Sequence, residues 1–272
     1  MPSLRSFLLP VGIITLIYGS VLFTLFPLPQ GTSQLALLVA LTSGILRSAA
    51  ITIMLYTMRR EEVSLVIPVV HTYPVFVAIM AIPILGESLV YLQWLAVIIV
   101  VAGAVMISIR RESTGRGTWL GKSFLLLISS SLLLAAANIA SKYALAYISF
   151  WNMYWLSAFC MSFFFLLLSL RPSVFKELHR MQHQGLSISL LTVNEALALV
   201  GVVLSFWAIE RGPVSLVSTI VATRPVFVFM FIIILSRVLP MFLEWHWTRA
   251  TLALRFAAIA MIVAGVAIIH LV

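Results

Sequence analysis

The sequence predicts an all-α, polytopic membrane helix bundle. Of its 272 residues, 62% are hydrophobic and only 9% are charged, whereas soluble domains carry about 25% charged residues. A surface that faces water needs many polar and charged side chains, so this shortage of charged residues indicates that much of the surface faces lipid. The net charge of +9 comes from basic residues clustered between long apolar runs, a pattern typical of membrane orientation. We therefore expect membrane lipid, and no nucleic acid, as a partner.

A membrane-spanning helix needs about 20 apolar residues, and the chain contains nine such runs. Turn-forming glycines and prolines occupy most of the short connections, and no stretch is long enough for a soluble domain. The predicted spans are 6–26, 34–56, 63–85, 92–109, 119–145, 150–170, 187–209, 214–236 and 249–270.

The lysines and arginines predict the orientation of these spans in a cell membrane. With the N-terminus in the cytoplasm, twelve of them lie on inside segments and two on outside ends, and Arg47, Arg224 and Arg255 lie within spans. This is a strong positive-inside bias. It places the C-terminus outside if the chain has nine spans.

Two stretches of the chain repeat each other. Residues 63–77 read VSLVIPVVHTYPVFV and residues 214–228 read VSLVSTIVATRPVFV, so both copies begin with Val-Ser-Leu-Val and end with Pro-Val-Phe-Val at an offset of 151. Val-Ala-Gly recurs at 101–103 and 263–265, at an offset of 162. The fixed spacing indicates an internal repeat. We assign residues 1–112 to the first copy and residues 119–272 to the second.

The predicted orientation makes the two copies run in opposite directions across the membrane. Such inverted repeats build transporters, because two antiparallel copies open alternately to either side of a central site. The offset pairs span 6–26 with the sixth span. It also pairs the second, third and fourth spans with the last three spans of the chain. Span 119–145 has no mate, so the arrangement is four spans plus five. We expect that the chain either lacks its true N-terminal helix or has an altered, laterally open first half.

Three segments resemble the drug/metabolite transporter superfamily, specifically its EamA-like branch. They are Glu62-Val63-Ser64-Leu65-Val66 with Tyr73-Pro74-Val75-Phe76, then Leu85-Gly86-Glu87 with Gln93-Trp94-Leu95, and Val100-Val101-Ala102-Gly103. The resemblance implies two five-helix repeats and a secondary carrier without a nucleotide-binding domain. The second copy departs from the pattern, because Ser236-Arg237 replace Gly86-Glu87.

Charged groups at membrane depth usually face the interior of a bundle, and two such groups lie on repeat-related spans. Arg47 is a candidate substrate contact, the alternatives being a structural ion pair or a snorkelling side chain. Glu195, beside Asn194, maps to Gly44, one helical turn from Arg47. Glu195 is the candidate proton-coupling group, since burial favours the protonated form of a carboxyl group. Its alternative role is a salt bridge to Arg47 or Arg224.

The repeated prolines mark a second group of candidates. Pro74 and Pro225 lie within spans, where proline frees a backbone carbonyl and kinks the helix. Tyr73 and Arg224 precede them, and His71 lies one turn before Pro74. We expect Arg47, His71, Tyr73, Asn194, Glu195 and Arg224 to line one cavity near mid-membrane. For His71 the alternative to a proton relay is a hydrogen-bonded structural role.

Three further charged residues lie near predicted span ends. Lys142 and Arg255 are expected to snorkel towards the nearest interface. Glu87 is expected to mark the boundary of a helix at a turn.

The function predicted from these features is secondary transport or export of a small metabolite or drug-like solute. The alternatives are a membrane-embedded enzyme and a lipid-handling, flippase-like protein. All eight acidic residues are Glu, and no HExxH, GxSxG or GxxxxGK[ST] motif is present, so an enzyme is not expected. We expect no cofactor or metal. The arginines would suit an anionic substrate, and a homodimer is one arrangement that the sequence allows.

Overall fold

The computed structural model describes residues 4–61, 63–108, 122–179, 184–224, 226–227, 230–231, 234 and 249–271, and the regular elements among them are helices. Five of these helices are long and apolar enough to cross a membrane. The elements are α1 (Leu4–Leu25), α2 (Gln34–Met58), α3 (Val63–Val70), α4 (Tyr73–Leu85), α5 (Tyr91–Ser108), α6 (Lys122–Leu145), α7 (Phe150–Ser169), α8 (Pro172–His179), α9 (Gln184–Arg211), α10 (Val214–Val221) and α12 (Arg249–Leu271). The predicted membrane helix bundle is confirmed.

The helices differ from the predicted spans at several points, one of which is the eighth predicted span, where α10 ends at Val221. The third predicted span consists of two helices, α3 and α4, separated by His71 and Thr72. A short helix, α8, occupies the expected connection between the sixth and seventh spans and begins at Pro172. Proline suits the first turn of a helix, because that position needs no intrahelical N–H donor.

The chain divides into two compact units, each taking helices from both repeats. Unit 1 comprises Met1–Arg59 and Ala136–Gly212, and unit 2 comprises Arg60–Ala135 and Pro213–Val272. The spatial units are therefore not the sequence repeats, whose boundaries at 1–112 and 119–272 stay a prediction. Helix α6, which the sequence predicts to be without a repeat mate, contributes its first half to unit 2 and its second half to unit 1.

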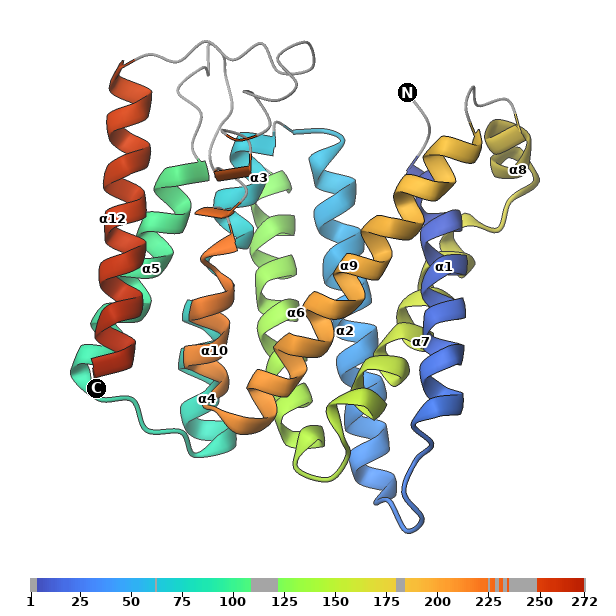
Figure 1. Cartoon of the computed structure of the whole chain (residues 1–272), viewed down its shortest axis with the longest axis horizontal. Helices are drawn as coiled ribbons and strands as arrows, with labels where there is room; N and C mark the ends of the chain where they lie inside the picture. Colours follow the sequence, from blue (N-terminus) through green and yellow to red (C-terminus); the bar gives the residue numbers. More distant parts are fainter. Residues whose placement is uncertain are drawn as a thin grey trace. The chain divides into compact units, whose positions relative to one another are not determined.

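In unit 1, the predicted mates α1 and α7 pack against each other in opposite directions (Figure 1). A Cβ added at Gly12 would lie 3.3 Å from Phe165, and one at Gly19 would lie 3.2 Å from Ala158. The Ser162 hydroxyl donates to the Gly12 carbonyl at 2.8 Å. Small residues allow this close approach of two helix backbones.

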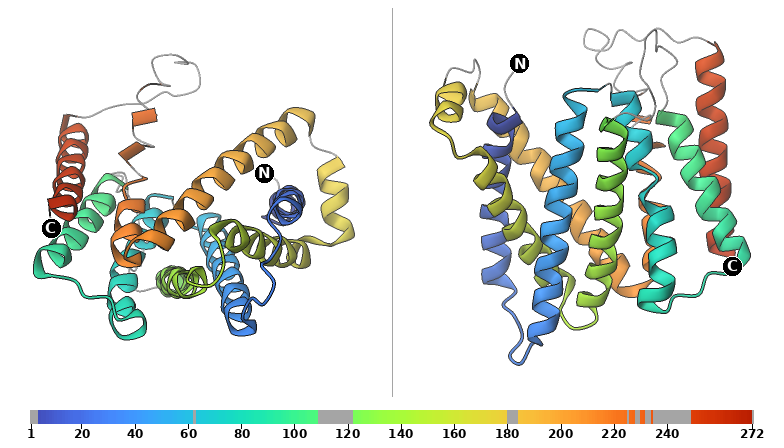
Figure 2. Two further views of the ribbon diagram at one scale, coloured as in Figure 1. Left: turned by 60° about the horizontal axis from the view of Figure 1, so that its bottom comes forward. Right: turned by 180° about the vertical axis from the view of Figure 1, so that it is seen from behind.

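In unit 2, the mates α5 and α12 also run antiparallel, side by side in both views of Figure 2. Gly103 lies against Ala258 and Ile262 on α12, while its mate Gly265 lies against Ala96 and Val100 on α5. Subtracting the offset of 162 from residues 258 and 262 gives 96 and 100. The contact is therefore symmetric about a local two-fold axis perpendicular to the helices. This is the geometry of the predicted inverted repeat.

Candidate functional site

The first part of the candidate site is the break between α3 and α4. The last turn of α3 closes through hydrogen bonds from His71 N to the Ile67 carbonyl at 3.0 Å and from Thr72 N to the Val69 carbonyl at 3.2 Å. Thr72 is the N-cap of α4, and Pro74 stands in its first turn. Proline lacks the N–H that would continue α3 through this point. Pro74 therefore begins a new helix instead of kinking a continuous one.

The second repeat breaks at the equivalent residues. Helix α10 ends at Val221, and Ala222 and Thr223 form a turn. Three backbone hydrogen bonds recur at the offset of 151: Ala222 N to Ser218 O, Thr223 N to Ile220 O, and Val226 N to Thr223 O, which match His71 to Ile67, Thr72 to Val69, and Val75 to Thr72. Pro225 lies outside the described residues. The repeat thus extends to the backbone geometry of the breaks.

Side chains of unit 2 bind the carbonyls at these breaks. The Tyr73 hydroxyl donates to the Ser218 carbonyl in the last turn of α10 at 3.3 Å, and α10 packs on α4 with the opposite direction (Figure 1). The Ser131 hydroxyl of α6 donates to the Val69 carbonyl at 3.1 Å. A break in a membrane helix persists only where such groups satisfy the freed backbone. The two breaks are thus linked by Tyr73.

The other two predicted residues of this unit lie at the same breaks. His71 is half-buried, and its Nδ1 is a buried atom without a hydrogen-bond partner among the described residues. Arg224 is exposed and lies within electrostatic reach of His71. Unit 2 therefore brings His71, Tyr73 and Arg224 together around two interrupted helices.

Unit 1 contains the other three predicted residues. Arg47 is half-buried and donates to Asn138 Oδ1 of α6 at 2.8 Å. Asn194 is exposed and donates to Glu195 at 3.3 Å, and Glu195 lies within electrostatic reach of the Tyr154 phenol. Three of the six predicted site residues belong to unit 1 and three to unit 2. A single cavity lined by all six therefore stays a prediction.

Glu87 has a role that the sequence did not reveal. Gly86 ends α4 in the left-handed conformation, with φ of 68°, which glycine adopts without a Cβ penalty. The Glu87 carboxylate then accepts hydrogen bonds from Val214 N at 2.6 Å, Ser215 N at 3.3 Å and the Ser215 hydroxyl at 2.6 Å. These backbone groups begin α10, and a helix N-terminus favours a negative charge. Glu87 is therefore the cap of α10.

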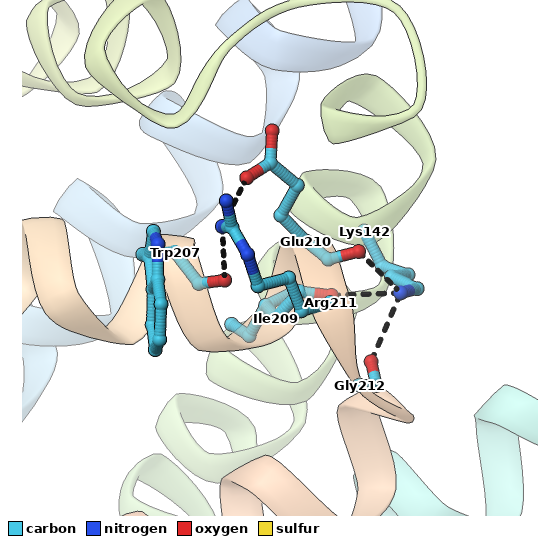
Figure 3. A network of polar contacts seen from close by, with 6 residues as sticks. All are labelled: Lys142, Trp207, Ile209, Glu210, Arg211 and Gly212. Atoms are coloured by element: carbon cyan, nitrogen blue, oxygen red, sulfur yellow. Dashed lines mark hydrogen bonds and ion pairs between the residues drawn. The ribbon is translucent and has the colours of Figure 1, made fainter.

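Lys142 likewise caps a helix, which corrects the expectation that it snorkels. Its ammonium group donates to the carbonyls of Ile209 at 2.7 Å, Glu210 at 3.2 Å and Gly212 at 2.9 Å (Figure 3). Nearby, Arg211 pairs with Glu210 at 2.7 Å and lies over the Trp207 ring. The terminal carbonyls of a helix favour a cation. Lys142 is therefore the cap of α9.

Arg255 also differs from the expectation. Its side chain is only 6% exposed, so it is part of the packed interior of unit 2 and does not snorkel. Helix α12 begins at Arg249 as predicted, and residue 255 lies nearly two turns inside it, where the packing of unit 2 covers the side chain.

Residues 6–109 match the sequence model of the EamA-like transporter family. This segment is similar to members of that family. The family supports a multi-pass membrane transporter of the drug/metabolite type, and the resemblance seen in the sequence is confirmed for the first repeat. The internal repeat relates most of the remaining helices to this EamA-like segment.

A solved chain, described only as "Crystal structure of protein", is similar in fold. It is 17% identical in sequence, with a TM-score of 0.59, over 99% of this chain and 96% of that chain. At this identity the similarity shows the fold alone. No curated protein matches the sequence significantly.

Sequence reasoning missed Asn138, Glu87 and Lys142 as partners of other helices. Asn138 is a polar residue in the apolar run LLLAAANIA, which is a usable signal of a buried role. The caps gave no such signal, because Glu87 is 127 residues from Val214 and Lys142 is 67 residues from Ile209.

Proposed function

We propose that the chain is a secondary transporter of a small solute that works by alternating access. The observation that supports this proposal is the pair of helix breaks, at 71–72 and 222–223, with three recurring backbone hydrogen bonds. Interrupted helices in inverted repeats supply substrate and ion sites in secondary transporters, because their ends present unpaired backbone groups at membrane depth.

The substrate contacts of this proposal are the polar side chains at the breaks. Arg224 presents an exposed guanidinium at the second break, and Tyr73 connects the first break to α10. A bound solute that interacts with these groups would bias the arrangement of both interrupted helices. Substrate binding and conformational change are thereby coupled at the same residues.

We also propose that the N-terminus lies in the cytoplasm, because twelve lysines and arginines fall on the inside segments and two on the outside ends. Inside-facing basic residues orient membrane proteins during insertion. An N-terminal tag accessible to antibody before permeabilisation of intact cells would contradict this orientation.

The test is solute uptake by reconstituted vesicles that contain the purified chain, with and without an imposed proton gradient. Wild-type vesicles should accumulate at least one solute of a metabolite panel in chemically unchanged form. Arg224→Ala should abolish this uptake at an unchanged amount of inserted protein, while the control Arg211→Ala, an exposed arginine paired with Glu210, should retain it.

The competing functions predict other outcomes. A membrane enzyme would return a chemically altered solute, and a flippase-like protein would move fluorescent lipid between leaflets without solute uptake. Either result with wild-type vesicles would overturn the transporter proposal.

A further inference from the structure

The helix breaks of unit 2 carry two basic side chains about halfway across the membrane. Helices α3 and α10 have 8 residues each, which is about 12 Å at 1.5 Å per residue, and the hydrocarbon core is about 30 Å thick. His71 directly follows α3, and Arg224 lies three residues after the end of α10. Ionisable side chains at this depth mark functional sites unless other protein groups satisfy them.

The repeat places Arg224 near the end of α3. The Tyr73 hydroxyl donates to the Ser218 carbonyl of α10 at 3.3 Å. At the offset of 151, the mate of Tyr73 is Arg224 and the mate of Ser218 is Ile67. The inverted repeat therefore brings Arg224 towards the last turn of α3, which His71 N closes on the Ile67 carbonyl at 3.0 Å. The electrostatic interaction of Arg224 with His71 agrees with this position.

The imidazole of His71 has an unused hydrogen-bonding atom. Its Nδ1 is buried and has no hydrogen-bond partner among the described residues. The hydroxyls nearby are engaged elsewhere, because Thr72 and Ser131 both donate to the Val69 carbonyl, at 2.7 Å and 3.1 Å. A buried polar atom without a hydrogen bond destabilises the protein. A bound molecule that supplied the missing hydrogen bond would therefore be favoured at this break.

The described carboxylates of unit 2 are bound at other places. Glu61 accepts a hydrogen bond from Ser123 at the beginning of α6, and Glu87 caps the beginning of α10. Within the described part of this unit, the exposed guanidinium of Arg224 instead lies within electrostatic reach of a second basic side chain, His71. This chemistry suits a negatively charged ligand.

We propose that Arg224 and His71 form a binding site for a small solute that carries a carboxylate or phosphate group. The planar donors of the Arg224 guanidinium match two oxygens of such a group. The Nδ1–H tautomer of His71 donates one further hydrogen bond to an oxygen of the bound solute. The proposal rests on the proposed transport function, since the solute would contact both interrupted helices, but binding alone tests it.

The probes are benzoate, phenyl phosphate and the neutral benzamide, added at constant ionic strength to the purified full chain in detergent. Calorimetry measures their affinities, and thermal unfolding measures the stabilisation that a bound ligand confers. The wild type should bind at least one of the anions and discriminate against benzamide. Arg224→Gln should abolish anion binding. The control Arg211→Gln, which changes an exposed arginine paired with Glu210, should bind as the wild type does.

Variants of His71 separate ligand binding from folding. His71→Phe keeps a ring but removes Nδ1, so it should weaken anion binding about tenfold, the usual effect of losing a hydrogen bond to a charged group. His71→Asn places an amide nitrogen close to the position of Nδ1 and should recover part of the affinity. Because Nδ1 has no described partner in the ligand-free protein, His71→Phe should not lower the unfolding temperature without ligand.

Several outcomes would overturn the proposal. They are no binding of either anion, binding of benzamide as tight as that of the anions, or unchanged anion binding by folded Arg224→Gln and His71→Phe. A histidine with only a structural role would give a less stable His71→Phe that keeps its anion affinity. Anion binding that depends on both residues in a chain that transports no solute would support the site and contradict only the transport function.

Discussion

Gly103 and its repeat mate Gly265 make reciprocal contacts. A Cβ added at Gly103 would lie 2.9 Å from the Ala258 carbonyl, and one added at Gly265 would lie 3.1 Å from the Ala96 carbonyl. Residues 96 and 258 are themselves mates at the offset of 162. Helices α5 and α12 therefore contact each other through equivalent surfaces, as in a two-fold symmetric interface.

The first prediction follows from this symmetry. Gly103→Ala and Gly265→Ala should each destabilise the protein, by about 1–3 kcal/mol, because the added methyl group meets backbone and forces the helices apart. The two effects should be similar. Thermal unfolding in detergent measures them.

Gly201 provides the matched control for these glycines. It lies in α9, and a Cβ added there meets nothing within 4 Å. Gly201→Ala should be neutral or stabilise the helix by up to about 1 kcal/mol. Equal losses of stability at all three glycines would contradict the close-packing explanation.

The second prediction concerns the cap of α10. Glu87→Ala removes the acceptor for two backbone N–H groups and the Ser215 hydroxyl, so we expect a loss of about 1–3 kcal/mol. Ser215→Ala should cost less, and the double variant should show a non-additive loss because the two residues share a hydrogen bond. Additive losses would indicate that the carboxylate and the hydroxyl act independently.

The third prediction concerns the cap of α9. Lys142→Met keeps the length of the side chain but removes three hydrogen bonds to carbonyls, and we expect a loss of stability of about 1–3 kcal/mol. Arg211→Met is the control, because exposed ion pairs contribute only about 0–1 kcal/mol. Limited proteolysis between α9 and α10 should also become faster in Lys142→Met and not in Arg211→Met.

The fourth prediction distinguishes a role of Glu195 in coupling uptake to protons from a role in moving the solute itself. If Glu195 carries the coupled proton, Glu195→Gln should remove the stimulation of uptake by a proton gradient, because an amide cannot exchange that proton. Exchange of labelled for unlabelled solute across vesicles without a gradient should continue. Uptake by Glu195→Gln that still follows the proton gradient would exclude Glu195 from coupling.

Much of the fold was predictable because its signals are local. Apolar runs predicted the long helices, and the repeated proline segments predicted kinks where the structure has breaks between helices. The pairing of helices across the chain was not predictable in the same way. The repeats occupy consecutive stretches of sequence, whereas each compact unit combines helices of both copies.

The candidate site was predictable only in part for a related reason. Arg47, Tyr73 and Arg224 stand out because polar residues are rare in such spans. Their partners do not: Asn138 is 91 residues from Arg47, and the acceptor of Tyr73 is the backbone of Ser218. A backbone carbonyl carries no sequence signature.

The division of the chain between its units has a consequence for biosynthesis. All segments of unit 1 have been translated once the ribosome passes Gly212, but unit 2 also requires α12. During synthesis, α5 therefore cannot make the contact of Gly103 with α12 until more than a hundred further residues have been made. Unit 2 contains helices that are translated early but reach their final packing last.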